Sequence, residues 1–280
     1  MKTPNIVVVA SLAAATLLTM SLLVTTATRS ASAPFDSSAG PLDVDTVARG
    51  LEHPWALAFL PDGKMLVTER PGRMRIVTRD GQVSVPLAGV PKPKTGGQAG
   101  LLDLALDKDF ADNRTLYFCF TSDTGGNASV ARAQLDEAAL RLEAVKVIFV
   151  QQGPGGAANH GCRIAQAPDG NLFVTLGDHF GPRDEAQNLA TDNGKLIRIA
   201  PDGSIPPDNP FVGRAKARPE IWSYGHRNAQ GLAFNPASGE LWEIEHGPRG
   251  GDEVNIIGKG KNYGWPVIGY GIDYSGAKIH

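Results

Sequence analysis

A histidine in a short loop has the chemistry needed to accept a proton. His160 lies in the run Asn159-His160-Gly161-Cys162-Arg163. A neutral imidazole has a pKa near working pH, which suits a general base. Considered alone, such a histidine more often only forms a hydrogen bond within its loop. Its role therefore depends on what the fold places around it.

Arg227 and Asn228 form a second polar pair. The planar guanidinium of an arginine binds carboxylates or an oxyanion that develops during a reaction. The alternative is a structural arginine that bridges two repeats of the fold. The pair is a candidate anion-binding element.

Two other patterns have the spacing of functional motifs, and we interpret both as loops. Asn127-Ala128-Ser129 fits a glycosylation acceptor. Asp178 and His179, with Asp184 and Glu185, could be taken for a metal cluster. They follow a strand that we expect to end near Asp178, which indicates a polar loop.

The elements that would position these residues recur along the chain. Each unit is an apolar strand, a turn and a second apolar strand, with the period-two alternation of half-buried strands. Pro61-Asp62-Gly63 and Pro168-Asp169-Gly170 supply the preset φ and the permissive glycine of a tight turn. The units span residues 55–69, 101–120, 163–178 and 231–245, and further strands are expected at 74–78, 145–150 and 195–199.

Self-similar repeats of short strands are typical of β-propeller blades. We therefore predict an all-β fold with about four blades in this chain. A generic β-sandwich with accidental turns is the alternative. Because a propeller protects its edge strands by closing the ring, we expect the complete ring to need sequence beyond His280.

Four segments, in this order and spacing, resemble the glucose/sorbosone dehydrogenase family, close to its soluble aldose sugar dehydrogenases. They are HPW at 53–55 with FLPDG at 59–63, GQAGLLD at 97–103, YGHRNAQGL at 224–232, and EHGPRGGDEVN at 245–255, which continues into NYGWP at 262–266. The resemblance covers about residues 43–280. It implies a six-bladed β-propeller domain at 43–280 that is incomplete at its C-terminus.

The resemblance also implies an activity. The family oxidises the anomeric carbon of aldose sugars to lactones, with the quinone cofactor PQQ as hydride acceptor. His160 matches the general base, and Arg227 with Asn228 matches residues that contact the cofactor and the reacting oxygen. Gln98 and Tyr274 match further cofactor contacts.

Calcium is the second implied cofactor, and it polarises the quinone. Gly247 and Pro248 match residues whose backbone carbonyls hold this ion, and carbonyl oxygens are ordinary Ca²⁺ ligands. Glu253 and the Tyr263 carbonyl match a second, structural Ca²⁺ site, to which Asp252 and Asp273 are further candidates. Considered alone, Glu253 would be a solvated surface carboxylate.

The sequence departs from the family at the presumed base. Relatives have histidine, one aromatic residue and then Gly-x-Arg, whereas the run from His160 to Arg163 is one residue shorter. Asn159 also stands where some relatives have aspartate. A displaced imidazole on the scale of an ångström would cost about 10²-fold in rate.

The N-terminus has the features of an export signal. Lys2 is followed by a mostly apolar run at 6–24 and by Ala31-Ser32-Ala33, an A-x-A cleavage pattern. We expect a signal peptide or membrane anchor at 1–33, with cleavage there or after Ala39, and a linker at 34–42. The expected location is periplasmic or extracellular.

Composition narrows the partners. The net charge of −2 and pI near 6.3 give no indication of a nucleic-acid partner. The two cysteines, Cys119 and Cys162, could form a disulfide in an exported protein. Because Cys119 lies in an apolar run, buried free thiols are the alternative. The partners expected from the resemblance are a small sugar and an external electron acceptor, with the chain a monomer or homodimer.

Two other functions use the same architecture. A Ca²⁺-dependent propeller lactonase or esterase would need several acidic or amide ligands that converge on the central channel. A sugar-binding propeller without catalytic activity is the other alternative, and the shortened loop at His160 is compatible with it.

Overall fold

The computed structural model describes residues 36–123 and 125–279. The chain divides into two compact units, Met1–Thr46 and Val47–His280. In the described part of the first unit the chain makes a turn in which Gly40 N donates to the Ser37 carbonyl at 3.0 Å. The export signal expected at 1–33 lies outside the described residues. Within the described part, no helix has the length and apolar character required to cross a membrane.

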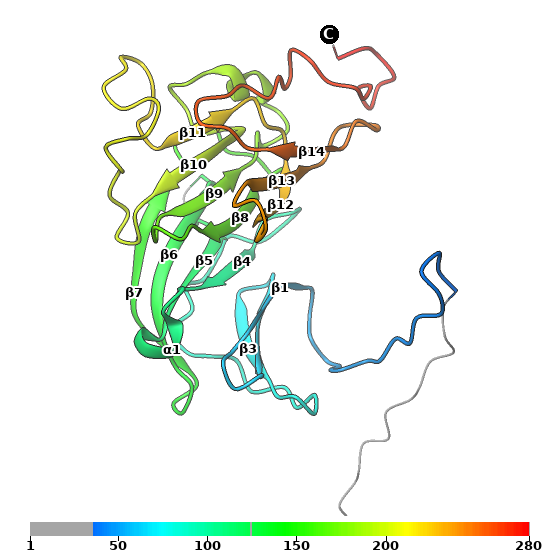
Figure 1. Ribbon diagram of the computed structural model, residues 1–280, viewed down its shortest axis with the longest axis vertical. Helices are drawn as coiled ribbons and strands as arrows, with labels where there is room; N and C mark the ends of the chain where they lie inside the picture. The colour runs from blue at the N-terminus through cyan, green and yellow to red at the C-terminus, as the bar shows by residue number, and fades with distance from the viewer. Residues whose placement is uncertain (1–35, 124, 280) are drawn as a thin grey trace, which may run out of the picture. The chain divides into compact units, whose positions relative to one another are not determined.

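The second unit is built from four antiparallel sheets, which we call blades 1 to 4 (Figure 1). The described residues add only a short helix, α1 (Phe110–Asn113), and a 3₁₀ turn, η1 (Arg183–Gln187). Blade 1 contains β1 (Pro54–Phe59), β2 (Met65–Glu69) and β3 (Arg73–Val77); blade 2 contains β4 (Leu101–Leu106), β5 (Thr115–Thr121), β6 (Ala128–Asp136) and β7 (Arg141–Val150); blade 3 contains β8 (Gly161–Gln166), β9 (Leu172–Leu176), β10 (Lys195–Ile199) and β11 (Ile221–Tyr224); blade 4 contains β12 (Ala229–Phe234), β13 (Leu241–Glu245) and β14 (Glu253–Ile256).

The first strand of each blade lies against the first strand of the next. Strand β1 contacts β4, β4 contacts β8, and β8 contacts β12. These four strands are therefore the inner strands around a common axis, as in a β-propeller. The prediction of four propeller blades is confirmed. Helix α1 lies between the two strands of the unit expected at 101–120, and the strand expected to reach Asp178 ends at Leu176.

The Pro-Asp-Gly turns form the hairpins that the sequence predicts. In blade 1, Leu60 N donates to the Lys64 carbonyl and Gly63 N to the Leu60 carbonyl, both at 2.8 Å. Gly63 has φ +82°, a left-handed conformation that glycine adopts without steric cost. The Asp62 carboxylate accepts from Lys64 N at 3.0 Å and completes the turn.

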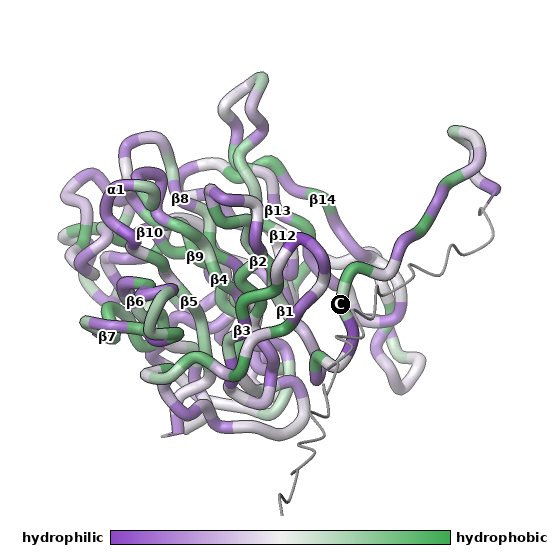
Figure 2. Tube along the Cα trace, turned by 90° about the horizontal axis from the view of Figure 1, so that it is seen from below, coloured by the Kyte–Doolittle hydropathy of each residue, from purple (hydrophilic) through white to green (hydrophobic). Residues whose placement is uncertain are grey.

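Blades stack face to face, and this changes the burial pattern. Every residue of β5 and β9 is buried, so these strands lack the half-exposed alternation that the sequence suggested. Figure 2 shows hydrophobic segments along the blade strands, with more polar connections between them. One core cluster between blades 1 and 2 includes the fully buried Leu66, Leu101 and Phe118. Packing on both faces gives the inner end of each blade a rigid support.

A disulfide joins blades 2 and 3. Cys119 of β5 and Cys162 of β8 are bonded, with their Cα atoms 6.3 Å apart and 43 positions apart in sequence. Both residues are fully buried. The sequence left a disulfide and free thiols as alternatives, and the structure shows the disulfide.

Candidate active site

One end of the blades gathers most of the predicted site residues. In the β12–β13 hairpin, Ala229 at the start of the inner strand pairs with Glu245 at the end of the second strand; blade 3 pairs Gly161 with Leu176 in the same way. Residues just before the inner strands therefore lie at the same end as residues just after the second strands. Each inner strand also has a register shift close to this end. Such irregularities commonly re-aim side chains beside active sites.

His160 is buried immediately before β8. Only 1% of its surface is exposed, and neither ring nitrogen has a hydrogen-bond partner of acceptable geometry. Burial lowers its pKa to about 4, although the nearby Ala157 carbonyl favours the protonated ring. The ring packs edge-on against His179 with 5.0 Å between centroids. The result is a neutral imidazole whose one basic nitrogen is able to accept a proton.

The shortened loop is held on both sides of His160. Gln98 Oε1 accepts from Asn159 N at 2.7 Å. Asn228 Oδ1 accepts from Gly161 N at 3.3 Å. Two predicted cofactor contacts thus lie against the loop of the predicted base and fix its backbone in this structure.

Asp178 and His179 belong to the same end of the propeller. Their segment is a loop after β9, as predicted, but both side chains are buried. Asp178 Oδ1 accepts from Asn159 Nδ2 at 2.9 Å, and burial raises the pKa of this carboxyl. A Cβ at Gly177 would lie 1.7 Å from the Asn159 carbonyl oxygen, so only glycine permits this approach. The sequence analysis did not link Asp178 and His179 to His160. Their position directly after the second strand of a blade was the signal that could have done so.

A cleft of about 360 Å³ opens beside Arg227. The guanidinium lies 5.3 Å from the Trp265 ring, and its Nη1 donates to the Gly247 carbonyl at 2.8 Å. Its Nε is buried without a hydrogen-bond partner. The cleft is lined by Asp178, Phe180, Gly181, Arg183, Arg227, Pro248, Trp265, Asp273 and Tyr274.

The walls of this cleft combine cations and aromatic rings. Arg183 and Arg227 supply positive charge, although Arg183 also pairs with Asp273 at 3.1 Å. The Tyr274 and Phe180 rings lie 6.0 Å apart at its edge. Such walls suit a planar, polyanionic ligand.

A second cavity, large enough for a single ion, lies behind Arg227. Its volume is about 10 Å³, close to that of one water or ion. Gly247, Pro248, Glu245 and Glu253 are among its lining residues. Carbonyl and carboxylate oxygens around so small a space suit a hard cation such as Ca²⁺. Gly247 and Pro248 thus both line this cavity, and their role as carbonyl ligands stays a prediction.

Glu253 is not a solvated surface carboxylate. It is partly buried, and its pKa is raised first by burial and also by the charge of Glu245. Asn255 Nδ2 donates to Glu253 Oε2 at 3.2 Å. Tyr263 stacks on His226 with 4.7 Å between ring centroids. Glu253 thus lies opposite Glu245 of the neighbouring strand β13, and Tyr263 lies against His226.

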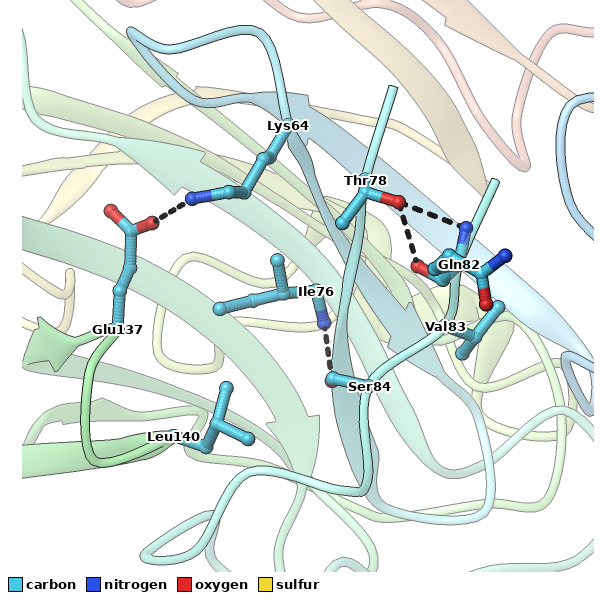
Figure 3. A pocket seen from close by; sticks show the side chains of 8 residues that line it. All are labelled: Lys64, Ile76, Thr78, Gln82, Val83, Ser84, Glu137 and Leu140. Atoms are coloured by element: carbon cyan, nitrogen blue, oxygen red, sulfur yellow. Dashed lines mark hydrogen bonds and ion pairs between the residues drawn. The ribbon is translucent and has the colours of Figure 1, made fainter. Parts of the chain in front are cut away.

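Another pocket lies at the opposite end of the blades (Figure 3). It occupies about 260 Å³ between blades 1 and 2. Ile76 and Leu140 give it an apolar floor, while Lys64 pairs with Glu137 and Thr78 accepts from Gln82 N at 2.9 Å (Figure 3). Lys64, Glu137 and Thr78 are thus already paired, and no predicted site residue lines this pocket.

Comparison with known proteins agrees with this geometry. The chain is 47% identical over 250 residues to an uncharacterized protein of Synechocystis, covering 82% of this chain and 60% of that protein. It is 44% identical over 243 residues to the aldose sugar dehydrogenase YliI of Escherichia coli, covering 85% of this chain and 65% of that protein. The chain thus spans less than two thirds of the length of these curated relatives.

The fold comparison gives the same result. A PQQ-bound aldose sugar dehydrogenase from Streptomyces coelicolor superposes with a TM-score of 0.73 at 36% identity, covering 83% of this chain and 68% of that one. Four blades that align with about two thirds of a relative agree with a six-bladed propeller. The model of the glucose / sorbosone dehydrogenase family matches residues 51–280. The chain therefore belongs to the glucose / sorbosone dehydrogenase family.

Proposed function

We propose that this chain carries the catalytic end of a PQQ-dependent oxidoreductase that converts aldose sugars to lactones at the anomeric carbon. One observation carries the proposal: the unpartnered imidazole of His160 is tied through its neighbouring residues to the cleft of Arg227. The relatives described as aldose sugar dehydrogenases support the substrate class. The proposal concerns the activity of a whole protein of this family, and this chain spans 60% and 65% of the lengths of the two curated relatives.

The cleft residues fit PQQ, a planar aromatic tricarboxylate. The Arg227 guanidinium would donate to a cofactor oxygen, and Tyr274 and Trp265 would offer apolar ring surface. The bound cofactor would supply the quinone that takes up a hydride. Gly247 and Pro248, which line the small cavity, would hold Ca²⁺ through their carbonyls. Glu253 with the Tyr263 carbonyl would hold a second ion, as the family resemblance implies.

His160 would remove the proton from the anomeric hydroxyl. Burial keeps the ring neutral, so a nitrogen lone pair is available over the whole physiological pH range. Gln98 and Asn228 would fix the ring's position by bonding the backbone on either side of it. Exclusion of water by the buried loop would strengthen the interaction between Arg227 and the developing negative charge.

We also propose that the protein is exported and acts in the periplasm or outside the cell. The disulfide between Cys119 and Cys162 supports an oxidising compartment, and the N-terminal signal pattern agrees with it. The partners would be a sugar and an external electron acceptor, with the protein a monomer or homodimer. Fractionation of cells that express the full chain would test the location, and recovery in the cytoplasm would contradict it.

The test of function is reconstitution with PQQ and Ca²⁺. We expect Ca²⁺-dependent quinone absorbance and aldose-dependent reduction of an artificial dye. His160→Asn is the matched control, which should keep the absorbance and lose dye reduction. If the wild-type chain gives no quinone absorbance and no dye reduction, the proposal is overturned. Hydrolysis of a sugar lactone without PQQ would favour the lactonase instead.

A further inference from the structure

Blade 4 encloses a group of acidic side chains that the proposed reaction does not use. Glu243 and Glu245 of β13 are buried, with 0% and 4% of their surface exposed. The buried His226 lies beside them, and one ligand atom from each of the three residues lies within 4.8 Å of the others. His226 Nδ1 is 3.2 Å from Glu245 Oε1.

In the part of the chain that the structure describes, the acidic side chains of this group have too few hydrogen-bond donors and no cationic side chain to neutralise them. Asn255 Nδ2 lies 3.1 to 3.2 Å from oxygens of Glu243, Glu245 and Glu253, so two N–H hydrogens face three carboxylates. Glu243 Oε1 is buried with no partner. Among the described residues, no lysine or arginine side chain pairs with Glu243 or Glu245. Buried carboxylates without a counter-charge are strongly unfavourable.

Blade 1 shows how the same position is neutralised elsewhere in this chain. Glu69 ends β2 as Glu245 ends β13, opposite the first residue of the inner strand in both blades. Each also accepts a backbone N–H from the residue two positions before that strand, Glu52 or Arg227. The two glutamates are therefore structurally equivalent.

The third strands differ. In blade 1, Arg73 and Arg75 of β3 both donate to Glu69 Oε2, at 2.8 and 2.9 Å. Although burial acts to raise it, these bonds hold the pKa of Glu69 at about 2. The register places Arg73 opposite Glu69.

Blade 4 has Glu253 and Asn255 where blade 1 has Arg73 and Arg75. Glu253 lies opposite Glu245, and Asn255 lies opposite Glu243. Burial, and then the charge of Glu245, raises the pKa of Glu243 to about 9. Compared with blade 1, blade 4 therefore has two guanidinium groups fewer and two carboxylates more, those of Glu243 and Glu253, around its equivalent glutamate.

We propose that a divalent cation binds between Glu243, Glu245 and His226, where it replaces the guanidinium groups that neutralise the equivalent glutamate of blade 1. Glu245 also lines the cavity beside Gly247 and Pro248, whereas Glu243 and His226 do not, so the two sites share one residue and differ in the others. Glu253, which we assign to the second Ca²⁺ ion, lies opposite Glu245 on the neighbouring strand β14. The site does not depend on the proposed sugar oxidation.

The distances suit an ion of this kind. Two ligand atoms 4.8 Å apart on opposite sides of an ion would each lie 2.4 Å from it. Two ligands about 2.2 Å from an ion and at right angles are about 3.1 Å apart, close to the 3.2 Å between His226 Nδ1 and Glu245 Oε1. An imidazole nitrogen among carboxylates favours a first-row transition metal such as Mn²⁺ or Zn²⁺.

The test measures metal content. Chain stripped by a chelator is dialysed against Mn²⁺, Zn²⁺ or Ca²⁺ and analysed for bound metal by mass spectrometry. We expect Glu243→Gln, which imitates a protonated carboxyl, to bind one equivalent fewer than the wild type for at least one of these ions. Glu69→Gln in blade 1 is the matched control and should keep the wild-type metal content. Equal metal content in wild type and Glu243→Gln for all three ions would show that a proton neutralises Glu243, and would overturn the proposal.

A second variant keeps the test valid if Glu243→Gln folds poorly. Asn255→Arg places an arginine at the position that Arg75 occupies in blade 1, so that a side chain of the protein supplies the missing positive charge. It should bind one metal equivalent fewer, and it should melt at a higher temperature than the wild type when both are metal-free. Substitution of Co²⁺ into the wild-type site should give visible d–d absorption that both variants lack. Unchanged metal content and Co²⁺ absorption in Asn255→Arg would overturn the proposal.

Discussion

The burial of His160 has a measurable consequence for stability. Its pKa is about 4 in the folded chain and near 6.5 when the ring is in water. Below pH 6.5 the unfolded chain therefore binds a proton at this residue that the folded chain does not bind. Stability must fall as the pH falls through this window, since protons favour the state that takes them up. A difference of 2.5 pKa units corresponds to about 3 kcal/mol by pH 4.

The assay compares the wild type with His160→Gln by urea unfolding between pH 4 and pH 8. The difference in unfolding free energy between the two chains should be constant above pH 7, where the His160 ring is neutral in both the folded and the unfolded wild type. Below pH 6.5 the wild type should lose up to about 3 kcal/mol relative to the variant. His179 remains in both chains, but the charge of His160 also lowers its pKa, so the His179 ring is titrated by NMR in both chains as well. NMR titration of the His160 ring protons gives the folded-state pKa directly.

A flat difference between the two chains across this range would refute the argument, as would a measured pKa of 6 or above for folded His160. The folded-state pKa of His160 also sets the expected pH dependence of catalysis. If His160 is the base, sugar oxidation should decline on the acidic side near pH 4, and His160→Gln should lower kcat by about 10²–10⁴ with PQQ binding retained.

Other perturbations test the fold and the cleft. Replacing Cys119 and Cys162 by alanine opens a loop of 43 residues and should cost about 4 kcal/mol by loop entropy, which calorimetry would detect as a lower Tm; an unchanged Tm would contradict a structural disulfide. Arg227→Ala should weaken both PQQ absorbance and turnover, because its charge acts on bound cofactor and transition state alike, and a loss confined to turnover would exclude a role in binding. Trp265→Leu removes the ring beneath Arg227 and should weaken PQQ binding less than Arg227→Ala does, as measured by absorbance titration. Phe118→Ala, at a fully buried position, should cost about 3–5 kcal/mol in urea unfolding, and a cost below about 1 kcal/mol would contradict the packing between blades 1 and 2.

The strand pattern was readable because its causes are local. Pro61-Asp62-Gly63 sets the dihedral angles of a turn whatever surrounds it, and the structure has the hairpin there. The expected strand at 195–199 coincides with β10. Alternation in β5 failed as a guide to exposure, because stacked blades cover both faces of this strand. Such coverage depends on neighbours that are distant in the sequence.

For the site, the sequence determined the residue types and the family. His160, Arg227 and Gly247 could be named from motifs, and their roles stay predictions. The N-terminal signal rests on composition alone, and export likewise stays a prediction.

Only the tertiary structure decided the environment of these residues. The Cys119–Cys162 bond joins strands of different blades, so no local spacing could reveal it. The low pKa of His160 arises from desolvation by segments that the ring meets only in the folded chain. The unbalanced charge around Glu243 appears only when strand register sets Asn255, and not an arginine, opposite it. Charge balance and burial are sums over contacts in space, and for these residues most contacts come from segments far away in the sequence.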